Sequence, residues 1–160
     1  MNHATDPPQA AIAARYGVNF TVGEHSARHL RRILRAYLIA WEMPELNDAA
    51  GLALTELVAN VVRHVPDRRA ALLMLWRADG VRVEVTDTCP RPPLSTAVDE
   101  IGEGGRGLMI VEGVTDRWGW NPLPGRAGKT VWFECRVKRD PALGEVCESS
   151  APASRTPPPD

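Results

Sequence analysis

Apolar residues recur at three- and four-residue steps along the segment from Glu24 to Trp41. This spacing places them on one face of an α-helix, whose period is 3.6 residues, and therefore predicts an amphipathic helix. The other side of that helix is basic, since it carries Arg28, Arg31, Arg32 and Arg35. We expect the apolar side to pack against the rest of the domain and the arginines to face solvent.

A second helix is predicted over the largely apolar segment Ala49–Val65, with Pro44 able to sit in its first turn. Within this segment, Glu56, Asn60 and His64 follow one another in steps of four. Steps of four stack side chains on successive turns of one helix face. Because an unpaired carboxylate is costly to bury, this polar stripe should line a cleft.

Two strands and a tight turn are predicted next. The segments Ala70–Ala78 and Val81–Asp87 flank Asp79-Gly80, a dipeptide that favours a β-hairpin turn. The second segment alternates apolar and polar residues, as half-buried strands do. Its valines at positions 81, 83 and 85 should therefore face a core.

A proline- and glycine-rich connection of about eighteen residues, 88–105, separates this hairpin from the remaining elements. Helical spacing returns at Arg106–Val114, strands are predicted at Asp116–Trp120 and Lys129–Val137, and an extra strand at Arg15–Val22. Grouped helices and paired strands indicate an α+β fold. We expect a two-layer sandwich whose mixed, mostly antiparallel sheet carries the helices on one face.

Length and composition fit one domain. The chain has 160 residues, of which 44% are hydrophobic, as in ordinary globular proteins. We expect residues 15–138 to form the domain, residues 1–14 a flexible lead, and residues 139–160 a disordered proline-rich tail.

The formal net charge of −1 gives no reason to expect direct binding to nucleic acid or to an anionic membrane. The sequence shows neither a signal peptide nor an apolar run of membrane-spanning length, so we expect a cytoplasmic protein. The cysteines never form a CxxC pair, and we expect free thiols at Cys89, Cys135 and Cys147.

A glycine-rich segment, GEGGRG at residues 102–107, matches the dinucleotide-binding pattern GxGxxG. The preceding predicted strand ends about fifteen residues earlier, so a Rossmann turn does not fit. The segment GRAGKT, residues 125–130, lacks the first glycine of a P-loop and precedes a strand. The glycines still suit phosphate, because backbone amides that open a helix can approach it closely, with the side chain of Arg106 beside them.

Four segments resemble, in order, the N, G1, G2 and G3 boxes of the GHKL ATPase superfamily: ELVANVVRH, VTDTCP, GEGGRGLMIV and GKTVWF. The resemblance covers about residues 20–137 and is nearest to stand-alone bacterial anti-sigma-factor serine/threonine kinases. It implies the Bergerat fold of histidine kinases and Hsp90, with ATP and Mg²⁺ as cofactors.

Site roles follow from the boxes by resemblance. Asn60 would be the Mg²⁺ ligand, since a carboxamide oxygen suits a hard cation, and Glu56 would be the general base. His64 or neighbouring Arg63 would lie at the phosphate end of the helix. A partly buried capping residue is the alternative interpretation of His64.

The remaining boxes concern the base and the phosphates. Asp87 would accept a hydrogen bond from the adenine amino group, with Thr130 close by through water. Residues 94–105 would form the ATP lid. The phosphates would be covered by Gly102, Gly104, Gly105, Arg106, Gly107 and Leu108.

The resemblance implies a regulatory kinase that binds a sigma factor and phosphorylates an anti-anti-sigma partner of the STAS type, and it leaves room for a homodimer. The alternative is a non-catalytic module that sequesters a partner in a nucleotide-dependent way. It is motivated by Cys89 and Arg91, where such kinases usually have Asp-x-Gly-x-Gly, and by Glu103, which would repel a γ-phosphate. Duplex DNA binding through the arginines of the first helix is a third interpretation, and an acidic partner is another ligand for that face.

Overall fold

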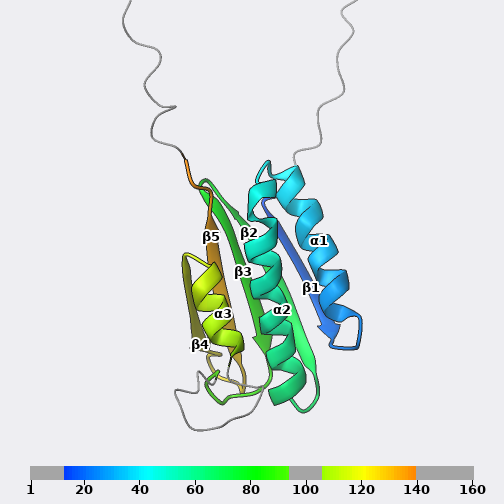
Figure 1. The fold of residues 1–160 in the computed structure, drawn as a ribbon. Coiled ribbons are helices and arrows are strands. Elements are labelled where there is room, and N and C mark those ends of the chain that lie inside the picture. The colour runs from blue at the N-terminus through cyan, green and yellow to red at the C-terminus, as the bar shows by residue number, and fades with distance from the viewer. Residues whose placement is uncertain (1–12, 94–105, 140–160) are drawn as a thin grey trace, which may run out of the picture.

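The computed structural model describes residues 13–93 and 106–139. Figure 1 shows a sheet covered on one face by helices, so the predicted two-layer α+β sandwich is confirmed. The predicted lead and tail lie outside the described residues, apart from 13, 14 and 139. The elements, in chain order, are β1 (Arg15–Thr21), α1 (Ser26–Ala40), η1 (Pro44–Leu46), α2 (Asn47–His64), β2 (Arg69–Arg77), β3 (Gly80–Asp87), α3 (Gly107–Val114), β4 (Arg117–Pro122) and β5 (Lys129–Arg136).

The five strands lie in the order β1-β2-β3-β5-β4, and every neighbouring pair is antiparallel. The predicted extra strand near residue 15 is therefore real, and it forms one edge as β1. The sheet is not mixed as we expected, because none of the pairings between the described strands is parallel. In the register of β3 and β5, Asp87 lies opposite Lys129 and Thr86 lies opposite Thr130.

The core lies between the sheet and the helices. Strand β3 turns its valines 81, 83 and 85 inward as predicted, and β5 adds Val131, Phe133 and Cys135 from the same side. Helix α1 buries leucines 30, 34 and 38, which follow the expected four-residue spacing. Phe133 and Leu34 are completely buried, so the core spans both layers.

Helix α2 runs through the middle of the helical layer, between α1 and α3 (Figure 1). It begins at Asn47, and Pro44 belongs to the separate 3₁₀ turn η1 rather than to the first turn of α2. Leu54, Leu57 and Val61 face the sheet side of the core, whereas Leu52 and Val62 are exposed. Among the described residues, no helix is apolar over a length sufficient to cross a membrane.

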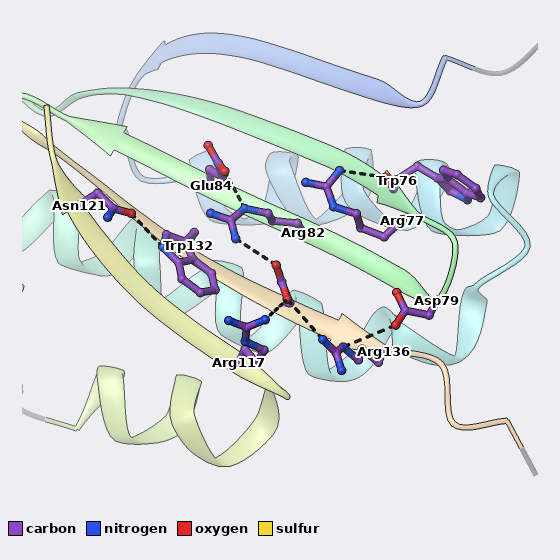
Figure 2. Close-up of polar contacts among 10 residues, drawn as sticks. Trp76, Arg77, Asp79, Arg82, Glu84, Arg117, Asn121, Trp132 and Arg136 are labelled. Atoms are coloured by element: carbon purple, nitrogen blue, oxygen red, sulfur yellow. Dashed lines mark hydrogen bonds and ion pairs between the residues drawn. The ribbon is translucent and has the colours of Figure 1, made fainter. Parts of the chain in front are cut away.

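None of the helices among residues 13–93 and 106–139 covers the opposite face of the sheet, which carries a network of charges (Figure 2). Arg82 of β3 donates to Glu84 at 2.7 Å and to Glu134 of β5 at 3.0 Å. Its guanidinium also lies 4.0 Å from the ring centre of Trp132, whose indole N–H donates to Asn121 of β4 at 3.2 Å. These contacts join three neighbouring strands on the face away from the core.

Candidate functional site

Two residues of the polar stripe of α2, Asn60 and His64, lie at a cavity, as the helical spacing predicted. Glu56, Asn60 and His64 are all partly exposed on this helix. Asn60 and His64 line a cavity of about 250 Å³ that is enclosed by α2, by the ends of β3 and β5, and by the segment after β3. Asn60 and His64 therefore face a recess that can enclose part of a small ligand.

Glu56 lies beside the start of α3. A methyl group added to Gly107 would lie 2.7 Å from Oε2 of Glu56 and 3.6 Å from Oδ1 of Asn60. Glycine at position 107 thus allows the backbone of α3 to approach both polar groups of α2 closely. The first backbone N–H groups of a helix have no partner within the helix, so this close approach brings an anion-favouring helix end next to Asn60.

The cavity wall is mostly apolar. Apolar walls with a few polar groups suit a flat ring system, which packs against the apolar side chains and is held by a few hydrogen bonds at one edge. The lining residues are Leu57, Asn60, Val61, His64, Val85, Asp87, Cys89, Arg91, Pro92, Pro93, Lys129 and Val131.

A buried ion pair forms the polar part of the wall at the ends of the two central strands. Asp87 ends β3 and Lys129 begins β5, and these side chains are only 6% and 5% exposed. The ammonium Nζ of Lys129 lies 3.0 Å from each carboxylate oxygen of Asp87. Burying either charge alone would be strongly unfavourable, so each depends on the other.

The backbone after β3 completes the pair. The N–H of Cys89 donates to Oδ1 of Asp87 at 2.8 Å, and Nζ of Lys129 donates to the carbonyl of Cys89 at 3.2 Å. Gly128 lets the start of β5 lie close to the backbone of Asp87, because its φ of +133° lies in a region that favours glycine. A side chain there would collide with the carbonyl oxygen of Asp87 and with Leu123.

His64 is held towards its neutral form. Burial lowers the pKa of His64 below its ordinary value of 6.5, because an apolar environment disfavours the imidazolium. Positive charges add to the shift and are carried by Arg63, Lys129 and Arg91, while Asp87 opposes it. A neutral imidazole keeps one ring nitrogen as a hydrogen-bond acceptor.

Two predicted site residues do not present their side chains to the cavity. Thr130 lies on the opposite face of the sheet, where its hydroxyl is 2.7 Å from that of Thr86. Its side chain points away from that of Asp87, since neighbouring residues of a strand point to opposite faces, and its water-mediated role near the base stays a prediction. Leu108 is 2% exposed and belongs to the core, so only its backbone is available to a phosphate.

Arg106 precedes α3 and is exposed. The other predicted phosphate and lid residues, namely Gly102, Glu103, Gly104, Gly105 and the rest of 94–105, lie outside the described residues. Sequence reasoning missed Lys129, because only Thr130 of the GKTVWF segment was given a role in the site. An isolated lysine at an inward-facing strand position was the available signal.

The described residues can hold a metal only in part. Among residues 13–93 and 106–139, no three His, Cys, Asp or Glu side chains gather as a metal site. Asn60 offers one hard oxygen and Glu56 lies near it. This donor set fits Mg²⁺, which takes most of its ligands from phosphate and water when it is bound with a nucleotide.

The profile of the family described as "Histidine kinase-like ATPase domain" matches residues 20–135. The chain belongs to this family. The ATPase domain thus covers almost the whole described fold, and the resemblance to the GHKL superfamily is confirmed. No curated protein matches the chain.

A solved structure shares the fold of this ATPase domain. A chain in the crystal structure of the SiaB-SiaC complex from Pseudomonas aeruginosa superposes with a TM-score of 0.58 at 13% sequence identity. The match covers 74% of this chain and 88% of the other. At this identity, the likeness concerns the fold.

Proposed function

We propose that the domain binds Mg-ATP in the cavity beside α2 and acts as a regulatory serine/threonine kinase. The observation that carries the proposal is the convergence of Asn60, His64 and Asp87 on one apolar cavity, with Glu56 and the start of α3 next to Asn60. The base would enter between the ends of β3 and β5. The phosphates would extend towards Asn60 and α3.

In this proposal three residues of α2 have separate roles in phosphoryl transfer. Asn60 holds Mg²⁺, which neutralises charge on the phosphates when bound. Glu56 accepts the proton of a hydroxyl group on the partner. The oxygen of that hydroxyl forms a bond to the γ-phosphorus, and ADP leaves with the electrons of the broken bond between the γ-phosphorus and its bridging oxygen. Neutral His64 can accept a hydrogen bond near the phosphate end of the helix.

The proposed partners are a sigma factor, which the domain sequesters, and a STAS-type anti-anti-sigma protein, which it phosphorylates. The order of the four boxes supports this assignment, as does the likeness to a chain crystallised in a two-protein complex. The exposed arginines of α1 provide a basic surface for an acidic partner. Association of two copies is part of the same proposal.

Nucleotide binding is tested by titrating ATP with and without Mg²⁺. Asn60→Ala should weaken binding at least tenfold with Mg²⁺ present and change it little in EDTA. Asn47→Ala is the matched control, because Asn47 lies on the same helix about 20 Å away at 1.5 Å per residue. Equal Mg²⁺-dependent affinities for wild type and Asn60→Ala would place the metal elsewhere.

Phosphoryl transfer is tested separately, with radiolabelled ATP and a STAS partner. Glu56→Gln should abolish phosphorylation of the partner while ATP still binds, whereas Glu112→Gln, an exposed change on α3, should retain it. If wild type binds Mg-ATP and the partner without any transfer, the non-catalytic sequestering module is the correct function. The cavity favours this second candidate at one point, since Arg91, Pro92 and Pro93 line it in place of a glycine-rich hinge.

A further inference from the structure

The buried pair of Asp87 and Lys129 places a hydrogen-bond donor group beside an acceptor group in the cavity wall. Nζ of Lys129 lies 3.0 Å from each carboxylate oxygen of Asp87 and 3.2 Å from the carbonyl oxygen of Cys89, so its three N–H donors face three oxygens. Oδ1 of Asp87 accepts from Lys129 and from the N–H of Cys89, which leaves Oδ2 with fewer partners. A ligand in the cavity can take one N–H of Lys129 while the ion pair is kept through the other carboxylate oxygen, so the wall offers a donor and an acceptor side by side.

A carboxylate alone could not distinguish adenine from guanine. It only accepts hydrogen bonds, so it can pair with the amino group of adenine or with the ring N–H and amino group of guanine. A neighbouring ammonium adds a donor and requires an acceptor on the ligand. Both groups are buried in the cavity wall at the ends of β3 and β5, where the base would enter, and they can meet the edge of the base that lies farthest from the ribose.

On adenine, that edge carries the 6-amino group, a donor, next to ring nitrogen N1, an acceptor. We propose that Lys129 is a base-reading residue, which donates a hydrogen bond to N1 of adenine while Asp87 accepts one from the 6-amino group. This inference rests on the proposed binding of ATP. It assigns to the protein a contact that Asp87 alone cannot make.

The proposal explains why a lysine is buried at a strand end. A lysine that only neutralised Asp87 could be replaced, together with Asp87, by apolar residues at little cost in stability. A lysine that reads the base also sets specificity. Inosine and guanosine triphosphates carry an N–H at N1, so a donor would face the ammonium of Lys129 and an unmatched buried donor would result.

The first test leaves the protein unchanged and alters the ligand. Wild type is titrated with ATP, with 1-deaza-ATP, in which a carbon replaces N1, and with 7-deaza-ATP. Loss of the acceptor should weaken binding on the order of tenfold or more, as for a hydrogen bond to a charged group. The 7-deaza analogue, which keeps N1, should bind within about twofold of ATP, because the contact to N1 is unaffected.

The second test changes the lysine. Lys129→Met should bind ATP and 1-deaza-ATP with equal affinity, whereas Lys138→Met, which alters the only other lysine at an exposed position, should discriminate like wild type. Equal binding of both nucleotides by wild type would overturn the role of Lys129 and leave the ATP site intact. A wild type that binds no ATP at all would overturn the nucleotide site and the base contact together. The wild-type comparison decides the matter even if Lys129→Met is unstable.

Discussion

The ion pair between Asp87 and Lys129 should dominate the local stability of the domain without ligand. Removal of one partner leaves the other charged and nearly buried, a change that costs about 3–5 kcal/mol in proteins. The pair lines a cavity, so water can reach an orphaned charge and the lower end of that range applies. We therefore expect Asp87→Asn and Lys129→Met each to lose about 3 kcal/mol of the free energy of unfolding.

The double variant Asp87→Asn/Lys129→Met should behave differently from the sum of its parts. It buries no charge, and the asparagine oxygen can still accept from the N–H of Cys89. Its free energy of unfolding should lie within about 1 kcal/mol of wild type, because a buried pair is nearly balanced by its desolvation cost.

Urea unfolding followed by fluorescence of the five tryptophans measures all three variants. With a slope of about 1.5–2 kcal/mol per molar, each single change should lower the midpoint by roughly 1.5–2 M. Lys138→Met, at an exposed position, should shift the free energy by less than about 0.5 kcal/mol. If the loss in the double variant equals the sum of the single losses, the two side chains are energetically independent and the reasoning fails.

Three further outcomes are expected. Gly128→Ala should lose more than about 1 kcal/mol, because φ of +133° and the carbonyl of Asp87 leave no room for a side chain, and a stability equal to wild type in urea would contradict this. His64 binds its proton more weakly in the folded state, so the free energy of unfolding should fall as pH drops below 6.5 and through the lowered folded pKa. His64→Gln should lack this part of the decline between pH 7.5 and 5.5. An identical pH profile of wild type and variant would contradict the lowered pKa of His64. Burial, with the charge of Asp116 adding to it, raises the pKa of Cys135 to about 12, so iodoacetamide should label this thiol only after unfolding, as peptide mass spectrometry can show; rapid labelling of the native protein would disprove the burial.

Local periodicity sufficed for the elements and for part of the site. The four-residue steps of Glu56, Asn60 and His64 fixed their common helix face, and the alternation in β3 identified its buried valines. These patterns depend only on the geometry of a single helix or strand. Each can be read from residues that are close in the sequence.

The partner of Asp87 depended on a contact that no local pattern contains. Lys129 lies 42 positions further along the chain, and it meets Asp87 only because β5 pairs with β3 in one particular register. The same register sends Thr130 to the other face of the sheet. A shift of one residue along a strand exchanges inward and outward side chains, so a site at the junction of two strands requires the register as well as the sequence.

The charged face of the sheet shows the same limit. The alternation in β3 places Arg82 and Glu84 on the face opposite to its buried valines, but it does not show that they form one network with Glu134. Their contact follows from β3 and β5 being neighbours. That neighbour relation places β5, the last strand in the chain, inside the sheet rather than at its edge.

Strand β4 therefore forms the edge of the sheet opposite to β1, where another sheet could pair with the domain. It is short and largely exposed, and Pro122 at its end has no backbone N–H to donate. Gly119 within it lies against the ring of Trp132, and Arg117 places a charge at its start. Proline, glycine and charge in an edge strand discourage the addition of a further strand. This side of the domain is protected against edge-to-edge aggregation, even though none of the described helices covers the outer face of its sheet.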